Sequence, residues 1–200
     1  MYTQKRLLKS YDLFDFDKTL TFKDTLFGFY EICNGGKISF PKKIIYFFTS
    51  FLNYINLISN TNFKRIGVKL FLVGKKKSEI ESYSILYSKK ILLSELYFNE
   101  FKKCKNKIII TASFENYVKK IFDNDDSVTT YGSSLSYDKN LKVIGLKKNL
   151  FGFYKKKYLI NKGFKSFNSF YTDSMSDKYL FSMSKEVYLV KDGKYKKYSK

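Results

Sequence analysis

The spacing of apolar and polar residues changes along the chain and divides it into three parts. Residues 11–16 alternate apolar with polar positions, which predicts a strand. In the following stretch, 23–103, apolar residues recur at helical spacing and predict a block of helices. From residue 107 onwards, short apolar runs alternate with helical stretches, which is typical of a parallel sheet covered by helices. The pattern predicts a Rossmann-like α/β core, 1–22 and 104–200, with a helical-bundle domain inserted after its first strand.

Turn residues and apolar runs define the expected boundaries of the helices and strands. Pro41 suits a first helical turn, and Ser78 suits a helix cap. The predicted helices are 24–33, 41–58, 62–73, 78–101, 115–122, 152–161 and 176–183. The predicted later strands are 107–111, 128–131, 135–137, 142–144, 169–172 and 187–190, with a last strand after the turn at 191–194.

Charge is the most unusual feature of the composition. The chain has 38 Lys+Arg against 18 Asp+Glu, for a formal net charge of +20, and Arg6 and Arg65 are its only arginines. This excess has three open explanations: nucleic-acid binding, attraction of anionic substrates or a membrane surface, and the codon bias of an AT-rich genome. Nucleic-acid readers depend on arginine for bidentate contacts to bases, so we do not expect nucleic acid as a partner.

Residue types that are scarce exclude several chemistries. The chain has 0 His, which rules out Ser-His-Asp and Cys-His catalysis and any His-ligated metal within it. Cys33 and Cys104 lie far apart without a CxxC motif, which favours reduced thiols. The charged segment before residue 11 contains no apolar run like that of a signal peptide, and 44–58 is too short to span a membrane. We therefore expect a cytoplasmic protein.

Acidic residues gather where two of the predicted strands end. Asp15 and Asp17 follow the first strand, and Asp173 and Asp177 follow the strand at 169–172. A solvated turn before a helix would also explain the first pair alone. Ligands bind at the carboxyl ends of strands in open α/β sheets, however, and grouped carboxylates without histidine favour Mg²⁺. Thr111 ends a third strand, and a lysine of the helix at 152–161 precedes the second acidic pair.

These four segments together resemble the motifs of the haloacid dehalogenase (HAD) superfamily. DFDKTLT resembles its first motif, DxDx[TV], and the strand ending in Thr111 resembles its second. LFGFYKKKYL resembles the third, a lysine on a helix, for which Lys155 is preferred and Lys156 and Lys157 are alternatives. YTDSMSD resembles the fourth, GDSxxD, with Thr172 in place of glycine. The phosphoserine-phosphatase-like branch, with a helical cap between the first two motifs, is the most similar.

The resemblance implies an Mg²⁺-dependent phosphatase that acts on a small phosphorylated metabolite. It implies that Asp15 attacks phosphorus and forms an aspartyl-phosphate, and that Asp17 is the general acid and base. Mg²⁺ would be held by Asp15, the backbone carbonyl of Asp17, and Asp173. Thr111 and Lys155 would hold phosphoryl oxygens, and Asp177 would support a metal-bound water or orient Lys155.

Substrate specificity is the least defined part of the resemblance. Asp24 lies nine positions after Asp15, where phosphoserine phosphatases place a glutamate that binds the substrate ammonium, although an acid there also suits a first helical turn. Arg65 is the only arginine of the insert, and its position does not match the arginine that binds the substrate carboxylate. An amino-alcohol or glycerol-type phosphate is therefore expected ahead of phosphoserine. Thr19 and Ser113 complete the candidate substrate-binding residues.

Two other functions remain open. A lipid head-group phosphatase of the phosphatidylglycerophosphate type would use the apolar segment 44–58 and nearby lysines, Lys42, Lys43 and Lys75–Lys77, to contact an anionic membrane surface. A packed helix of the insert explains the same segment and is the preferred interpretation. A nucleic-acid-binding module has only the net charge in its favour.

Overall fold

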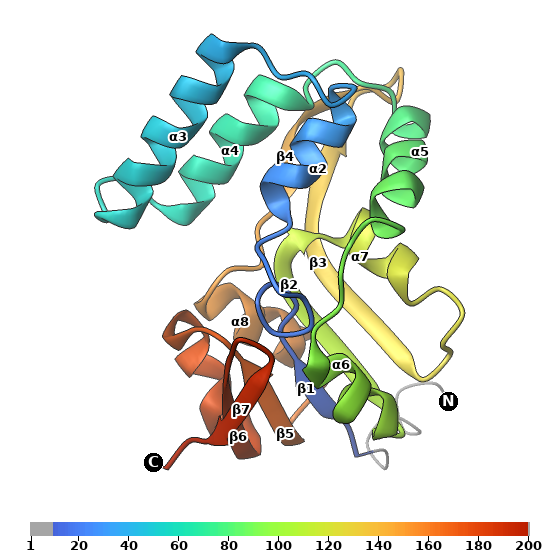
Figure 1. The fold of residues 1–200 in the computed structure, drawn as a ribbon, viewed down its shortest axis with the longest axis vertical. Helices are drawn as coiled ribbons and strands as arrows, with labels where there is room; N and C mark the ends of the chain where they lie inside the picture. The colour runs from blue at the N-terminus through green and yellow to red at the C-terminus, as the bar shows by residue number, and fades with distance from the viewer. Residues whose placement is uncertain (1–9, 200) are drawn as a thin grey trace.

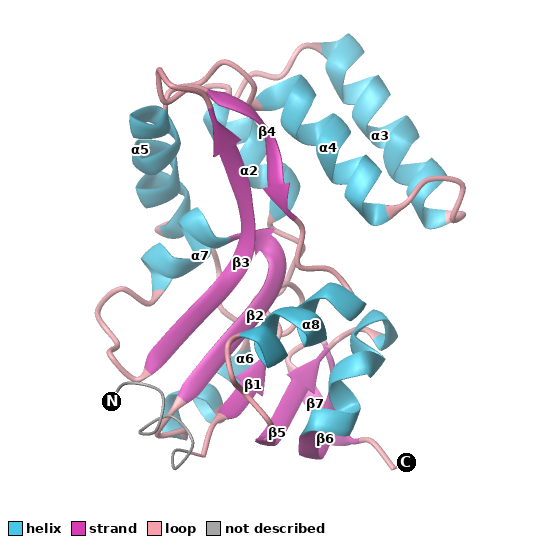
Figure 2. Ribbon diagram, turned by 180° about the vertical axis from the view of Figure 1, so that it is seen from behind, coloured by secondary structure: helices cyan, strands magenta, loops and turns pink. Residues whose placement is uncertain are grey.

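The computed structural model describes residues 10–199, which fold around a seven-stranded sheet with helices on both faces (Figures 1 and 2). Its strands are β1 (Asp12–Phe14), β2 (Lys107–Phe114), β3 (Val128–Tyr137), β4 (Val143–Lys148), β5 (Phe167–Thr172), β6 (Ser184–Lys191) and β7 (Lys194–Lys197). The order is β4-β3-β2-β1-β5-β6-β7. The five inner strands pair in parallel, and β4 and β7 add antiparallel edges. This confirms the predicted α/β core; residues 1–9, discussed above as the charged start, lie outside the described range.

Helices occur both on the sheet and in a block beyond one end of it. They are α2 (Leu26–Cys33), α3 (Phe40–Tyr54), α4 (Asn60–Phe71), α5 (Lys77–Ser88), α6 (Glu95–Asn99), the 3-10 helix η1 (Phe101–Lys103), α7 (Glu115–Ile121), α8 (Phe153–Asn161) and the 3-10 helix η2 (Met175–Met183). We call α2–α5 the cap. Figure 1 shows α3 and α4 side by side, projecting away from the sheet. No helix within residues 10–199 is long and apolar enough to cross a membrane.

Side chains of the inner strands alternate between two apolar layers. Leu13 and Ile108 lie in the layer that packs against α8 and η2, whereas Phe14 and Ile109 lie in the layer shared with α6, α7 and the cap. β2 is covered on both faces, and its buried residues Ile108, Ile109 and Ile110 form a continuous apolar run in the sequence. The free thiols Cys33 and Cys104 agree with the expectation of reduced cysteines.

The long helix predicted at 78–101 is wrong. The chain leaves the helical conformation after α5 and returns beside the first motif, where Ser94 N donates to Leu20 O over 2.9 Å. Ser94 Oγ also donates to Thr19 O over 2.7 Å, and α6 then begins. In η1, Phe101 packs edge-on against Phe14 of β1 at 4.9 Å between ring centroids. Residues 95–103 thus pack against the core. The predicted boundary of the insert at residue 103 stays a prediction.

The two short strands predicted at 128–131 and 135–137 are one strand, β3. Gly132 is the reason, because a Cβ atom there would lie 2.6 Å from the backbone nitrogen of Glu115. The glycine therefore permits a close approach to the start of α7 instead of forming a turn. Similarly, the predicted helix at 176–183 is the 3-10 helix η2.

The cap is attached to the core by more than its two connections. The segment between α4 and α5 pairs with the edge strand β4: Gly74 N donates to Val143 O, and Val143 N donates to Lys75 O, both over 2.9 Å. Thr25 Oγ1, at the start of α2, also shares a hydrogen bond of 2.8 Å with Tyr117 Oη of α7. These bonds fix the cap above the carboxyl ends of the inner strands.

Candidate active site

A cavity of about 200 Å³ lies between the cap and the carboxyl ends of β1, β2 and β5. Both predicted acidic clusters reach it, because β1 and β5 are neighbours in the sheet. The cap contributes one wall through α4, and the core contributes the other through β2 and α8. The lining residues are Asp15, Asp17, Lys18, Asp24, Leu26, Asn60, Phe63, Lys64, Ala112, Ser113, Phe151, Lys155, Asp173, Ser174 and Ser176.

Asp15 is buried at the end of β1, at the base of the cavity. Its backbone nitrogen donates to Tyr171 O over 2.9 Å, which continues the pairing of β1 with β5. Its Oδ1 accepts from the backbone nitrogen of Phe16 over 2.8 Å and lies 2.9 Å from Lys155 Nζ. Burial raises the pKa of Asp15 well above its ordinary value, and Lys155 opposes this effect. The second oxygen, Oδ2, therefore remains for other partners.

Lys155 connects the two acidic clusters. It projects from the first turn of α8, and its buried Nζ donates to Asp177 Oδ2 over 2.6 Å as well as contacting Asp15. Burial lowers the pKa of Lys155, but the two carboxylates outweigh burial and hold the pKa above its ordinary value. Of the three candidate lysines, Lys155 alone lines the cavity among the described residues. Lys156 donates to Ser182 Oγ over 3.0 Å instead, and Lys157 faces a different cavity.

Asp177 is buried in η2 and holds Lys155 in place. Thr172, which stands where the resemblance expects glycine, donates its hydroxyl to Asp177 Oδ2 over 3.1 Å. Thr172 Oγ1 also accepts from the backbone nitrogen of Ser174 over 3.2 Å. The departure from the motif thus adds a hydrogen bond that orients Asp177.

Asp17 also lines the cavity and has its own hydrogen-bond donors. Oδ1 accepts from Thr25 N over 2.8 Å and Thr25 Oγ1 over 2.6 Å, and Oδ2 accepts from Ser113 Oγ over 2.6 Å. Burial and the nearby charge of Asp24 raise the pKa of Asp17 to about 6, although these hydrogen bonds act in the opposite direction. A carboxyl group with this pKa can exchange protons near neutral pH.

Of the two predicted hydroxyl residues of β2, Ser113 lines the cavity, whereas Thr111 is not among the described residues that line it. Thr111 is fully buried, and its Oγ1 accepts from the backbone nitrogen of Ser113 over 2.9 Å. Ser113 lines the cavity and donates to Asp17. Asp24 also lines the cavity, and its Oδ1 accepts from Leu26 N over 2.9 Å at the start of α2. The position of Asp24 therefore fits both interpretations from the sequence, a substrate-binding carboxylate and an acid at the start of a helix.

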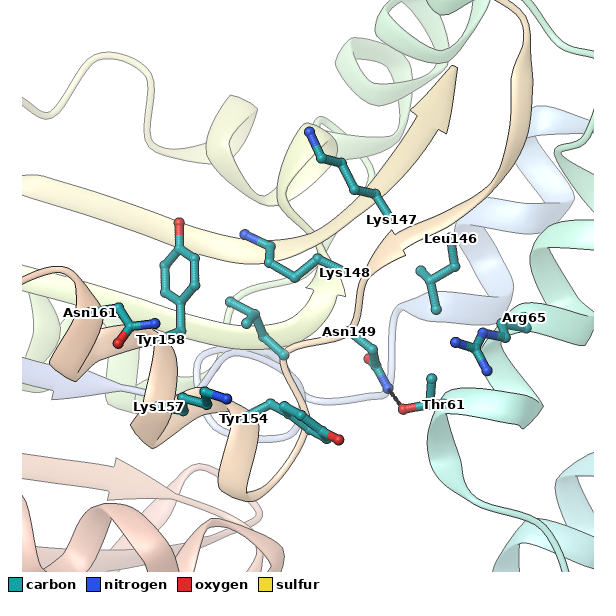
Figure 3. A pocket seen from close by; sticks show the side chains of 11 residues that line it. Thr61, Arg65, Leu146, Lys147, Lys148, Asn149, Tyr154, Lys157, Tyr158 and Asn161 are labelled. Carbon is teal, nitrogen blue, oxygen red and sulfur yellow. Dashed lines mark hydrogen bonds between the residues drawn. The ribbon is translucent and has the colours of Figure 1, made fainter. Parts of the chain in front are cut away.

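The remaining two predicted substrate-binding residues lie elsewhere. Thr19 is fully buried beside Ser94 and is not among the described residues that line the cavity. Arg65 points into a second cavity of about 360 Å³, shown in Figure 3, where it donates to Asn62 Oδ1 over 3.1 Å. That cavity is larger, but the described residues that line it include no carboxylate, so it lacks the acids that line the cavity around Asp15.

Lys64 is a functional candidate that the sequence analysis did not identify. It extends from α4 of the cap into the core, where Nζ donates to Asn149 Oδ1 over 2.8 Å, to Ser133 Oγ over 3.4 Å and to Ala112 O. Asn149 in turn donates to Thr61 Oγ1 over 3.1 Å, the bond drawn in Figure 3. Burial lowers the pKa of Lys64 to about 8. The sequence does contain a signal for Lys64. At helical spacing it shares a face with Gly67, Val68 and Phe71, and a lysine on such an apolar face indicates a buried cation.

The residues around Asp15 suit a divalent cation. Asp15 and Asp173 both line the cavity, and burial raises the pKa of each, with nearby carboxylates adding to the effect. Oδ1 of Asp177 is buried without a hydrogen-bond partner among the described residues. Among the described residues, four carboxylates line the cavity against three lysines, Lys18, Lys64 and Lys155, and oxygen donors are those that Mg²⁺ prefers. No group of three or more His, Cys, Asp or Glu side chains within residues 10–199 is arranged to hold a metal, but the predicted set needs only Asp15, Asp173 and a backbone carbonyl.

Structural comparison identifies the fold. A HAD family hydrolase from Salmonella enterica subsp. enterica serovar Typhi matches with a TM-score of 0.60 and 16% identity over 88% of this chain and 60% of that one. A phosphoserine phosphohydrolase-like protein from Francisella tularensis subsp. tularensis SCHU S4 matches with a TM-score of 0.63 and 17% identity over 90% and 86% of the two chains. A phosphoserine phosphatase from T. onnurineus matches with a TM-score of 0.58 and 17% identity over 90% and 82%.

These likenesses establish that the chain has the fold of HAD hydrolases, in the form found in phosphoserine phosphatases. The chain spans 60% of the length of the Salmonella hydrolase. No protein-family model matches the sequence. A search of curated proteins likewise gives no significant match.

Proposed function

We propose that this protein is a phosphomonoester hydrolase in which Asp15 is the nucleophile. The observation that supports this most strongly is the placement of Asp15, Asp17, Asp173 and Lys155 around one cavity at the carboxyl ends of adjacent strands. The shared fold adds support, because HAD hydrolases and phosphoserine phosphatases are among the matching structures.

The first chemical step is attack on phosphorus by Asp15. Because Oδ1 already accepts from Phe16 N and lies beside Lys155, we assign the attack to Oδ2. A bond forms between Oδ2 and phosphorus while the bond from phosphorus to the leaving oxygen breaks. Asp17, protonated, gives its proton to that oxygen; the raised pKa of Asp17 supports this role. Lys155 offsets the negative charge of the phosphoryl oxygens.

The second step releases phosphate. Asp17, now ionised, takes a proton from a water molecule, and the water oxygen attacks phosphorus and breaks its bond to Asp15. Thr111 and Ser113 are proposed to position phosphoryl oxygens. The backbone nitrogens of Phe16 and Ser113 have protein acceptors in this structure, so binding of phosphate there requires them to exchange those partners.

Mg²⁺ is the proposed cofactor. Asp15, Asp173 and the backbone carbonyl of Asp17 would hold it, with Asp177 in support. When bound, the ion supplies positive charge that reduces the repulsion between a carboxylate nucleophile and a phosphate dianion. Removal of the metal with EDTA should abolish activity, and Mg²⁺ should restore it.

The proposed substrate is a small phosphorylated metabolite of the amino-alcohol or glycerol-phosphate type. A cavity of about 200 Å³ accommodates a small molecule, and Asp24 offers a carboxylate on the cap side for an ammonium or hydroxyl group. Lys64 is the nearest cap cation, but its three N–H donors already have three protein acceptors. A substrate carboxylate would therefore find no ready partner there.

A phosphate-release screen tests the proposal. The purified protein with Mg²⁺ would be assayed against phosphoethanolamine, glycerol phosphates, phosphoserine, sugar phosphates and phosphatidylglycerophosphate in mixed micelles. The proposal predicts turnover of an amino-alcohol or glycerol phosphate, abolished by EDTA. Absence of Mg²⁺-dependent release from every ester would contradict phosphatase function.

A lipid head-group phosphate is the second candidate substrate. The observation that favours it is the exposed apolar surface of α3, described below. Preference for phosphatidylglycerophosphate over the water-soluble esters in the same screen would select this candidate.

A further inference from the structure

Helix α3 carries apolar side chains on two opposite faces, and only one of them is packed. On the packed face, Tyr46 is buried against the rings of Phe27, Phe63 and Phe71. On the opposite side, Ile44, Phe48, Phe51 and Ile55 follow one another at helical spacing and remain exposed; Phe48 and Phe51 are 59% and 56% exposed. Figures 1 and 2 place α3 at the outside of the cap, with α4 between it and α2.

This exposed surface extends beyond the single helical stripe. Phe40 at the start of α3, Tyr54 at its end and Leu57 in the next loop are 75%, 83% and 70% exposed. Contiguous exposed apolar surface of this kind marks a contact site on a folded protein. We call this set the α3 surface: Phe40, Ile44, Phe48, Phe51, Tyr54, Ile55 and Leu57.

The charge of the segment that carries the α3 surface favours an anionic partner. Between Glu31 and Glu79 the sequence contains no Asp or Glu. The cations in that interval are Lys37, Lys42, Lys43, Lys64, Arg65, Lys69, Lys75, Lys76 and Lys77. On α3 itself, Lys43 is paired with Glu31 at 3.7 Å, and Lys42 is exposed on the side of the helix away from the apolar stripe. A second copy docking through the same surface would bring two cationic surfaces together, whereas an anionic partner with an apolar interior would satisfy both features.

We propose that the α3 surface docks onto an anionic lipid bilayer. A segment that combines large exposed apolar side chains with cations and no carboxylates is suited to the interfacial region of an anionic membrane. With 15 residues, α3 is about 22 Å long, which is short of the ~30 Å hydrocarbon core, so it lies along the surface. Asn60 and Phe63 of α4, just after the loop that carries Leu57, line the Asp15 cavity, so docking brings that cavity near the bilayer.

Vesicle co-sedimentation of the full chain tests this proposal. Wild type should bind phosphatidylcholine vesicles that contain phosphatidylglycerol, bind pure phosphatidylcholine much more weakly, and dissociate as salt rises from about 0.1 to 1 M. Phe48→Ser with Phe51→Ser should weaken binding roughly 30-fold or more, because two apolar side chains leave the bilayer. The control pairs Phe98→Ser with Leu92→Ser, which lie outside the α3 surface and are 55% and 76% exposed; it should bind like wild type.

Three results would overturn the docking proposal. One is absence of wild-type binding to phosphatidylglycerol vesicles at low salt, and another is equal binding by the Phe48/Phe51 variant. The third is a wild type that is dimeric and does not bind vesicles, together with a Phe48/Phe51 variant that is monomeric. This result would show that the α3 surface binds a second copy of the chain. Both variants change exposed side chains away from the cavity, so hydrolysis of a water-soluble phosphate ester should match wild type and report on folding. The binding measurement is independent of whether the protein is a phosphatase.

Discussion

The ammonium nitrogen of Lys155 lies 2.9 Å from Oδ1 of Asp15, and both side chains are buried. The contact joins α8 to the end of β1, two elements far apart in sequence. Lys155 also bonds to Asp177, so one cation stands between two buried carboxylates. The contact thus combines two roles, since it neutralises part of the charge of the folded site and places a positive group where a phosphate would bind.

Replacement of Lys155 should therefore damage both stability and activity. In Lys155→Met, Asp15 and Asp177 lose their common cation, and the free energy of unfolding should fall by about 3–5 kcal/mol. Phosphate release should fall by roughly 100-fold or more, since a charge that faces the phosphoryl group is lost. Urea denaturation and steady-state assays measure the two effects. Lys156→Met and Lys157→Met on the same helix are the controls, and a similar loss in either would contradict the assignment of Lys155.

The pH dependence of activity should respond to Asp24. Burial and the charge of Asp24 raise the pKa of Asp17 to about 6, so Asp24→Asn should lower that pKa. Because Asp17 must be protonated to act as the acid, the alkaline limb of kcat/KM for an alkyl phosphate should move to lower pH. Asp126→Asn, at an exposed site, should leave the limb unchanged. If the alkaline limb of Asp24→Asn stays at the wild-type pH or shifts to higher pH, the result would contradict the role of Asp17 as the acid.

Lys64 should make stability rise with pH on the alkaline side of neutrality. The pKa of Lys64 is about 8 in the folded protein and 10.5 ordinarily, because burial disfavours the charged form. Between these values the unfolded chain holds a proton that the folded protein has released, so the free energy of unfolding increases with pH. The increase for wild type relative to Lys64→Met should be on the order of 3 kcal/mol. Denaturation curves at pH 7.5 and 10 that give parallel changes for the two proteins would contradict this.

The main features of the fold and site could be predicted from the sequence because they depend on local patterns. The alternating pattern of β1 and the apolar run of β2 identify inner strands, and the residues at the ends of parallel strands share one edge of the sheet. This reasoning brings Asp15, Asp17, Asp173 and Lys155 to one cavity, as the structure places them. Thr19 has the right position in the motif, but it is fully buried and is not among the described residues that line the cavity.

Features that depend on tertiary contacts were not predictable in the same way. The break after α5 arises because Ser94 bonds to Leu20, a partner distant in sequence. Gly132 has the composition of a turn but permits a close approach to Glu115. The partners of Lys64 lie on β2, β3 and the segment before α8, so helical periodicity identifies only that a lysine occupies an apolar face.

The central claim is that Asp15 is the nucleophile, and the activity of Asp15→Asn tests it most directly. The substitution keeps the size of the side chain and removes the attacking charge, so the fold should be retained, as circular dichroism can verify. Phosphate release with Mg²⁺, measured on para-nitrophenyl phosphate and on the best ester of the screen, should fall to the level of a no-enzyme control. Turnover by folded Asp15→Asn at a rate near that of wild type would contradict the claim.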